Sequence, residues 1–270
     1  MRLNDEQVGL FRDQGFLLVE SVFDGKEVDA LREAFRRDGL IPGEQRIMEE
    51  HGDTVRAVYS SHRRQPEFAA LVRSSRLLGP AHQLLHEDLY LYQFKVNAKP
   101  PFTGDLWAWH QDYLAWKVAD NLPAPRLLNV GLYLDDVTEF NGPLIFIPGS
   151  HRNGLVSEGR RREQRSEQHL DPDDIRLTES QMAGLVQEHG MQSPKCPAGS
   201  VVFFDPEVVH GSAPNMSPFP RKLLIATYNQ VANQPRPVNE PRPEYLICRD
   251  TTPLRTADEP LDSLAGGGAK

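Results

Sequence analysis

The strongest constraint on the fold of this chain is a series of short apolar segments, each ended by proline or glycine, that begins at residue 89. In the first segment, Tyr90, Tyr92, Phe94 and Val96 alternate with Leu91, Gln93, Lys95 and Asn97. A period of two predicts a β-strand. Similar runs predict strands at 106–113, 127–134, 144–147, 199–212 and 221–228. Many short strands joined by turns indicate a mostly β fold, either a β-sandwich or a jelly-roll barrel.

Helical patterns are concentrated before these strands. Asn4 with Gln7 and Asp24 with Glu27 have the spacing of capping boxes. Two more helices are predicted over 66–78 and 80–86, each with a proline near its start. We therefore expect one domain over 1–270, with N-terminal helices flanking the sheet. It would comprise a helical flank (1–88), a jelly-roll core (89–231) with a polar insertion (156–190), and an irregular tail (232–270).

The polar insertion is expected to be either a lid over a site or a solvated excursion.

Composition limits the partners of the chain. The net charge of -8 argues against nucleic acid or an anionic membrane as a partner. No apolar run approaches the length of a membrane span, and the N-terminus lacks a signal core. Cys196 and Cys248 are expected to be free thiols, as in a cytoplasmic protein. We expect the protein to be a monomer or a homodimer and to act on a small molecule.

A histidine and a carboxylate two residues apart suggest a metal site. The sequence has four such His-x-Asp triplets, of which only His110 and Asp112 lie in an aromatic, strand-like setting, Trp107-Ala108-Trp109-His110-Gln111-Asp112-Tyr113. Residues i and i+2 of a strand point to the same face, so these two side chains would aim at one point. A third ligand would complete a facial triad for non-haem iron.

His210 is the candidate third ligand, because it ends an apolar strand and precedes Gly211. Two histidines and one carboxylate leave open positions, which suits Fe(II) that must also bind a co-substrate and O2. Arg221 begins the next strand and would need either an anionic partner or a water-facing position there. Gln93 and Lys99 are further polar groups that could reach an acidic ligand. A jelly-roll enzyme using Zn(II) or Mn(II) without a co-substrate, and a non-catalytic binder, remain alternatives.

Five separated motifs occur in the order found in one enzyme family. The chain resembles the phytanoyl-CoA dioxygenase (PhyH) family of Fe(II)/2-oxoglutarate-dependent oxygenases, and within it the ectoine hydroxylase branch. The motifs lie at 109–113, 141–144, 147–151, 210–215 and 220–221. Trp116, the stretch 120–126 and the run 217–221 carry the likeness to the branch.

The resemblance implies a double-stranded β-helix of the cupin-like type, with His110, Asp112 and His210 as iron ligands. It implies that Arg221 binds the distal carboxylate of 2-oxoglutarate. The helpers would be Lys99, Gln93 and Ser212, and the substrate contacts would be Trp116, Tyr113 and Asn97.

The chain departs from the ectoine hydroxylases directly after Asp112. Those enzymes typically have Phe-Glu-Thr-Trp-His, whereas this chain has Tyr113-Leu114-Ala115-Trp116-Lys117. We therefore expect hydroxylation of a different small molecule, an amino acid-like compound or a natural-product intermediate, with succinate and CO2 as co-products. Desaturation, cyclisation and epimerisation would use the same residues and remain alternatives.

Overall fold

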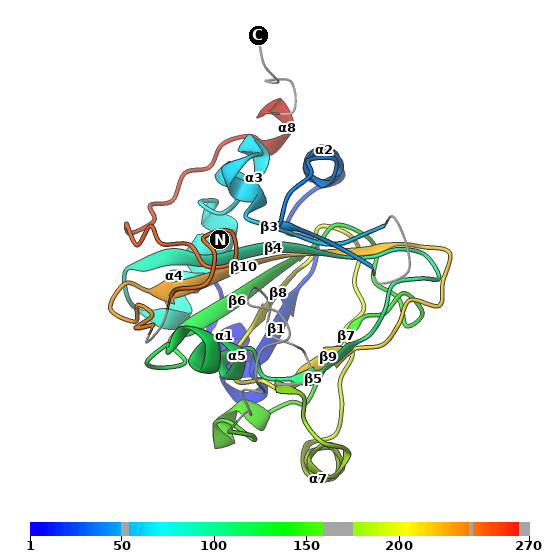
Figure 1. Cartoon of the computed structure of the whole chain (residues 1–270), viewed down its shortest axis with the longest axis vertical. Helices are drawn as coiled ribbons and strands as arrows, with labels where there is room; N and C mark the ends of the chain where they lie inside the picture. Colours follow the sequence, from blue (N-terminus) through cyan, green and yellow to red (C-terminus); the bar gives the residue numbers. More distant parts are fainter. Residues whose placement is uncertain (50–53, 159–174, 238–239, 265–270) are drawn as a thin grey trace.

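The protein is described by a computed structural model that covers residues 1–49, 54–158, 175–237 and 240–264. Its described strands form two antiparallel sheets that enclose a common interior (Figure 1). The larger sheet has the order β1-β8-β6-β10-β4-β3-β2, and the smaller has the order β5-β9-β7. The prediction of a mostly β, jelly-roll fold is confirmed.

The helices and strands have the following bounds. The strands are β1 (Phe16–Val19), β2 (Arg46–Met48), β3 (Val55–Tyr59), β4 (Leu89–Lys99), β5 (Trp107–His110), β6 (Leu127–Tyr133), β7 (Leu144–Phe146), β8 (Val201–Phe204), β9 (His210–Ser212) and β10 (Arg221–Gln230). The helices are α1 (Asp5–Gln14), α2 (Gly25–Gly39), η1 (Ser61–Arg63), α3 (Pro66–Leu71), α4 (Ser75–Leu85), α5 (Asp112–Asp120), η2 (Ser150–Asn153), α7 (Glu179–His189) and α8 (Leu261–Leu264).

The capping boxes at the starts of α1 and α2 are present as predicted. The prediction of helices at 66–78 and 80–86 is wrong in its boundaries. The first helix ends at Leu71, and Ser74 caps the second by accepting the N–H of Arg76. The second helix therefore begins five residues before Pro80 and contains that proline. Strands β2 and β3 lie within residues 41–65, a polar and mixed stretch whose sequence pattern predicts no element.

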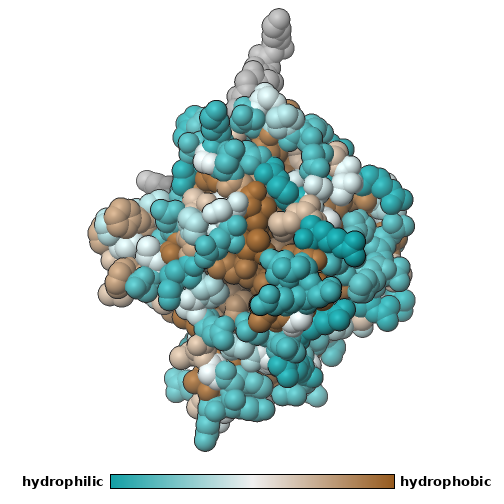
Figure 2. Space-filling model, turned by 180° about the vertical axis from the view of Figure 1, so that it is seen from behind, coloured by the Kyte–Doolittle hydropathy of each residue, from teal (hydrophilic) through white to brown (hydrophobic). Residues whose placement is uncertain are grey.

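The main hydrophobic core lies between the larger sheet and the helices that cover its outer face (Figure 1). Val28, Leu31 and Phe35 of α2 pack there, as the helical spacing predicts. Within the described residues, no helix is both long and apolar enough to cross a membrane. Figure 2 shows an apolar band down the middle of the face opposite to that of Figure 1, with polar side chains on both sides.

Strand β4 does not keep the simple alternation that its sequence predicts. Phe94 and Val96 pack in the main core, whereas Tyr90 and Tyr92 pack in a separate cluster with Trp116. The register between β4 and β10 shifts between Thr227 and Tyr228, and this irregularity changes the face on which the following side chains lie. As a result, the tyrosines and the polar side chains of β4 both line the interior between the sheets.

The end of the polar insertion packs against the smaller sheet. Leu177 and Met182 are buried with Ile147 and Val209, and the Leu177 N–H donates to the carbonyl of Trp109. Helix α7 begins with a capping box, in which the Thr178 side chain accepts from the N–H of Gln181. The charged runs at 160–163 and 171–174 belong to the insertion that was expected to be a lid or a solvated excursion. Both runs lie outside the described residues.

Candidate active site

Three side chains from three elements, β5, α5 and β9, converge at the mouth of the barrel. One ligand atom each of His110, Asp112 and His210 lies within 4.8 Å of the other two. His110 on β5 pairs directly with His210 on β9, which brings their rings to a centroid distance of 4.4 Å. The Asp112 carboxylate lies 3.4 Å from Nε2 of His110 and 3.7 Å from Nε2 of His210. The three residues that the sequence indicates as ligands thus lie together in the structure.

The expected reason for this convergence is partly wrong, because Asp112 is not in a strand. Strand β5 ends at His110, and Asp112 is the first residue of α5. Gln111 between them is still extended, with φ -118° and ψ 124°, so the two side chains can still approach each other. The Gln111 amide fixes this junction by donating to the carbonyls of Gly154 and Glu207. The junction is therefore held by loops distant in sequence.

Both histidines present a lone pair to the centre of the cluster. Nδ1 of His110 lies 2.6 Å from the carbonyl oxygen of Ala108, and Nδ1 of His210 lies 3.0 Å from that of Val208. A carbonyl oxygen only accepts, so each Nδ1 carries the proton and Nε2 is unprotonated in the neutral ring. Burial and the nearby His110 lower the pKa of His210 to about 4, which keeps it neutral. Two lone pairs and a carboxylate facing one another form a donor set that fits a divalent metal.

A buried polar chain orients the carboxylate, and the sequence analysis missed it. The Asn129 amide donates to Oδ2 of Asp112 at 2.9 Å, and the Thr227 hydroxyl donates to Oδ1 of Asn129 at 2.7 Å. These two residues face the interior from β6 and β10, which pair at this position. Hydrogen bonds to a ligand carboxylate fix its direction before a metal binds. Isolated polar residues within two apolar strands were the signal that could have found them.

Two buried basic side chains lie in the same interior. Arg221 and Lys99 are each 1% exposed. Arg221 donates from Nε and Nη2 to the carbonyl of Gly142, at 3.0 and 2.7 Å, and Lys99 donates to the carbonyls of Asp105 and Ala213. In the described part of the chain, no carboxylate forms an ion pair with either. Burial, and for Lys99 also the charge of Arg221, lowers the pKa of Lys99 to about 6 and that of Arg221 to about 10.

A buried guanidinium without a counter-ion is costly unless an anion binds beside it. Such an anion would also favour the charged form of the neighbouring Lys99 amine. Two buried hydroxyls, those of Ser212 and Tyr133, also have no hydrogen-bond partner among the described residues. Gly142 keeps the space open. With φ at 73°, it is in the left-handed region, and a Cβ there would meet Cδ of Lys99 at 2.7 Å. The residues present therefore fit a carboxylate co-substrate.

The interior face of β4 carries three more polar groups. Gln93 donates from Nε2 to the carbonyl of Leu246 at 3.1 Å, so the amide nitrogen points to the C-terminal tail. Its Oε1, like Oδ1 of Asn97, is buried without a partner in the described chain. Lys95 lies between them on β4. Burial opposes a low pKa of Asp112, but the contact with His110 and the charges of His210 and Lys95 lower it, so Lys95 lies near that carboxylate. The sequence analysis missed Lys95, which a strict reading of the alternation around Gln93 and Asn97 could have found.

An aromatic cluster forms the neighbouring wall. Trp116 of α5 packs edge-to-face on Tyr92, with ring centroids 5.4 Å apart, and the Tyr113 hydroxyl donates to the carbonyl of Leu122. Leu246 and Ile247 of the C-terminal tail are buried in the same cluster. Sequence reasoning treated this tail as irregular and peripheral, but it completes the wall.

An ion pair fixes the tail to α5. Arg242 donates to both carboxylate oxygens of Asp120, at 2.8 and 2.5 Å, and the Tyr92 hydroxyl donates to the same carboxylate at 2.5 Å. All three side chains are largely buried. The helix that begins with Asp112 is therefore held at its other end by the C-terminal tail.

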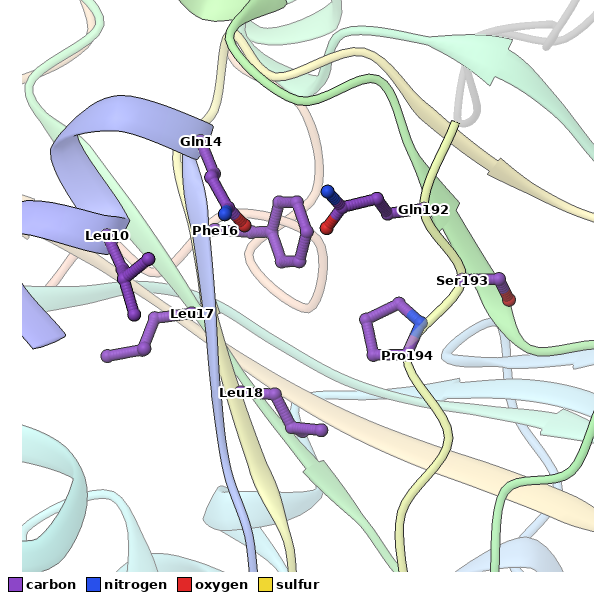
Figure 3. Close-up of a pocket in the computed structure, with 8 residues that line it drawn as sticks. All are labelled: Leu10, Gln14, Phe16, Leu17, Leu18, Gln192, Ser193 and Pro194. Carbon is purple, nitrogen blue, oxygen red and sulfur yellow. The ribbon is translucent and has the colours of Figure 1, made fainter. Parts of the chain in front are cut away.

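A separate surface depression lies between β1 and residues 192–194 (Figure 3). Its lining is Leu10, Gln14, Phe16, Leu17, Leu18, Gln192, Ser193 and Pro194. None of these side chains ionises or ligates a metal at neutral pH, so we assign no chemistry to it.

The fold, the ligand cluster and the two buried basic side chains define a non-haem Fe(II)/2-oxoglutarate-dependent dioxygenase. Comparison with known families agrees, because the model of the phytanoyl-CoA dioxygenase (PhyH) family matches residues 11–223. The chain belongs to this family.

Two curated relatives cover almost the whole chain. The chain is 36% identical over 270 residues to ectoine dioxygenase from Bordetella bronchiseptica, covering 97% of this chain and 87% of the relative. It is 38% identical over 265 residues to L-proline trans-4-hydroxylase from Streptomyces griseoviridis, covering 95% and 96%. Among solved structures, EctD from S. alaskensis with 2-oxoglutarate and 5-hydroxyectoine matches with a TM-score of 0.83 and 29% identity, covering 96% of this chain and 89% of that chain. The same enzyme with bound Fe matches with a TM-score of 0.82, 30% identity and the same coverages.

Proposed function

We propose that this dioxygenase hydroxylates a small amino acid-like molecule, with 2-oxoglutarate and O2 as co-substrates and succinate and CO2 as co-products. His110, Asp112 and His210 would hold Fe(II), which supplies the oxidising chemistry when bound. Arg221, Lys99 and Ser212 would bind the distal carboxylate of 2-oxoglutarate. The observation that carries this proposal is the presence, in one barrel, of a three-ligand cluster and two buried basic side chains that pair with no carboxylate of the described residues.

The substrate class follows from the polar groups of β4. One N–H of the Gln93 amide donates to the Leu246 carbonyl, and Oε1 of the same amide is a buried acceptor without a partner among the described residues. A carboxylate of 2-oxoglutarate would offer it no proton, whereas an amine or ammonium of a substrate would. Asn97 presents a second acceptor, and Lys95 presents a cation between the two. The acceptor oxygens of Gln93 and Asn97, with the Lys95 cation between them, complement a small molecule that carries both an N–H group and a carboxylate.

The neighbouring aromatic residues would orient the carbon skeleton and exclude water. Trp116 and Tyr113 are both buried in the cluster that the tail completes. Compounds of this class occur among the relatives: one is named L-proline trans-4-hydroxylase, and the EctD structure contains 5-hydroxyectoine. The run at 113–117 differs from that typical of ectoine hydroxylases, which favours an amino acid over ectoine as the substrate.

We also propose that residues 1–270 work as one oxygenase domain, with the helical flank, the strand core and the tail packed together. Two findings support this: β1, from the predicted flank, pairs with β8 of the core, and the tail is buried against α5. The net charge of -8 and the two free cysteines are consistent with a cytoplasmic monomer or homodimer that does not bind nucleic acid.

A screen of free amino acids and ectoine, measured by succinate formation and by mass spectrometry of the product, tests the proposal. We expect succinate in proportion to a product that has gained one oxygen atom, with L-proline as the first candidate. A product that has lost two hydrogens would instead indicate desaturation or ring closure. Succinate that no amino acid or ectoine increases above the uncoupled rate would refute the proposed substrate class.

The Lys95→Met variant tests the carboxylate contact. Loss of a charge-assisted hydrogen bond costs about 1.5–3 kcal/mol, so we expect KM for the accepted amino acid to rise by about 10- to 100-fold. The affinity for 2-oxoglutarate should not change, and neither should KM for the amide of the same amino acid. Lys26→Met, at an exposed position on α2, is the matched control. An unchanged KM in Lys95→Met would remove Lys95 from the substrate site.

A further inference from the structure

The hydroxyl of Tyr133 has no hydrogen-bond partner among the described residues, although the side chain is 0% exposed. Leaving a buried hydroxyl unpaired costs about 1–3 kcal/mol, and most buried polar groups in proteins are paired. Tyr133 is the last residue of β6 and pairs with Leu223 of β10, two residues after Arg221. Its phenol therefore lies on the interior side of the sheet, beside the buried guanidinium.

The charges around Tyr133 identify the kind of group that would pair with it. Burial raises the pKa of Tyr133 and outweighs the opposing effect of Arg221, so the phenol stays protonated and can donate. The Arg221 guanidinium offers only N–H donors, and it uses Nε and Nη2 on the Gly142 carbonyl. Two neighbouring donors without a shared acceptor are best satisfied by one anion that accepts from both.

We propose that the Tyr133 hydroxyl donates to the distal carboxylate of 2-oxoglutarate, together with Arg221. The inference rests on the proposed role of Arg221 and adds a ligand that the sequence motifs do not contain. A neutral donor opposite a cation also favours oxo acids that carry a second carboxylate over those that do not. Tyr133 is thus a residue that selects the co-substrate, at a distance from the metal cluster.

The test is an anaerobic titration of the Fe(II)-loaded protein with 2-oxoglutarate, followed by the visible charge-transfer band of the chelate. Removing one neutral donor to a carboxylate should weaken 2-oxoglutarate binding by about 10-fold in Tyr133→Phe. Binding of 2-oxobutyrate, which lacks the distal carboxylate, should be the same in this variant as in the unaltered protein. Equal losses for both oxo acids would mean that the hydroxyl supports the site in general, and would overturn the proposal.

Tyr228→Phe is the matched control. Tyr228 is equally buried, but its hydroxyl donates to the Val72 carbonyl at 2.8 Å, on the helix side of β10. We expect unchanged 2-oxoglutarate affinity and a lower melting temperature for Tyr228→Phe. In contrast, metal-free Tyr133→Phe should melt no lower than the unaltered protein, because its hydroxyl has no bond to lose. A clearly lower melting temperature of Tyr133→Phe would show that the hydroxyl has a structural partner.

The Arg221→Gln variant separates this inference from the proposed function. Full 2-oxoglutarate affinity in Tyr133→Phe, with lost affinity in Arg221→Gln, would refute the role of Tyr133 and leave the co-substrate site intact. Full affinity in both variants would refute the co-substrate site itself.

Discussion

Asp112→Ala protein is expected to fold and to bind no stoichiometric Fe(II). The substitution leaves two neutral imidazoles, which lack the negative charge that balances a divalent ion and the third donor of the facial set. His110→Ala should have the same effect, because it removes one of two lone pairs at the centre. Both variants should lose turnover completely. Metal analysis after anaerobic loading, together with circular dichroism, measures the two parts of this prediction.

The fold should survive because Asp112 lies at a junction and not in the hydrophobic core. Its loss leaves the Asn129 amide without an acceptor, which costs about 1–3 kcal/mol and should lower the melting temperature by a few degrees. Asp88→Ala is the matched control, since Asp88 belongs to another His-x-Asp triplet and is exposed. That variant should retain its iron. Full iron content in both His110→Ala and Asp112→Ala would contradict the metal assignment.

Arg221→Ala is expected to raise the 2-oxoglutarate concentration needed for half-maximal rate by about 100-fold or more. A buried, charge-assisted pair with a carboxylate contributes about 3 kcal/mol, and two roughly parallel N–H donors make that contact specific. Iron content should stay at the unaltered level, because none of the hydrogen bonds of Arg221 reaches the three-ligand cluster. The rate at saturating 2-oxoglutarate should fall much less than the affinity.

The control for Arg221→Ala is Lys222→Met, one position along the same strand. Lys222 points the other way and pairs with Asp135 at 3.1 Å, so its loss should leave the 2-oxoglutarate requirement unchanged. If Arg221→Ala and the unaltered protein need the same 2-oxoglutarate concentration for half-maximal rate, Arg221 does not bind the co-substrate.

The sequence predicted those features that depend on neighbours along the chain. The strand class, the capping boxes at Asn4 and Asp24, and the approach of His110 to Asp112 all arise within a few residues. His210 and Arg221 were found because each is an unusual residue at the end of an apolar strand. Family resemblance then assigned roles that spacing alone leaves open.

The features that were missed depend on contacts between distant segments. The change of face in β4 arises from its pairing with β10, more than 120 residues later. The bond from Gln93 to the carbonyl of Leu246 crosses 153 positions, and the pair of Asp120 with Arg242 crosses 122. No local pattern around Gln93 or Asp120 indicates such partners. The participation of the tail in the pocket therefore could not be predicted from periodicity.

The buried amine of Lys99 has a consequence for proton balance. With a pKa of about 6, lowered by burial and by Arg221, the amine is largely neutral at pH 8 while the site holds no anion. A bound carboxylate favours the ammonium form, so each binding event at that pH takes up close to one proton. Affinity for 2-oxoglutarate should then fall with rising pH above about 6, by up to tenfold per unit, and be insensitive to Lys99 below it. Calorimetry in two buffers of different ionisation enthalpy measures this uptake. The affinity of the enzyme for 2-oxoglutarate thus depends on the pH of the surroundings.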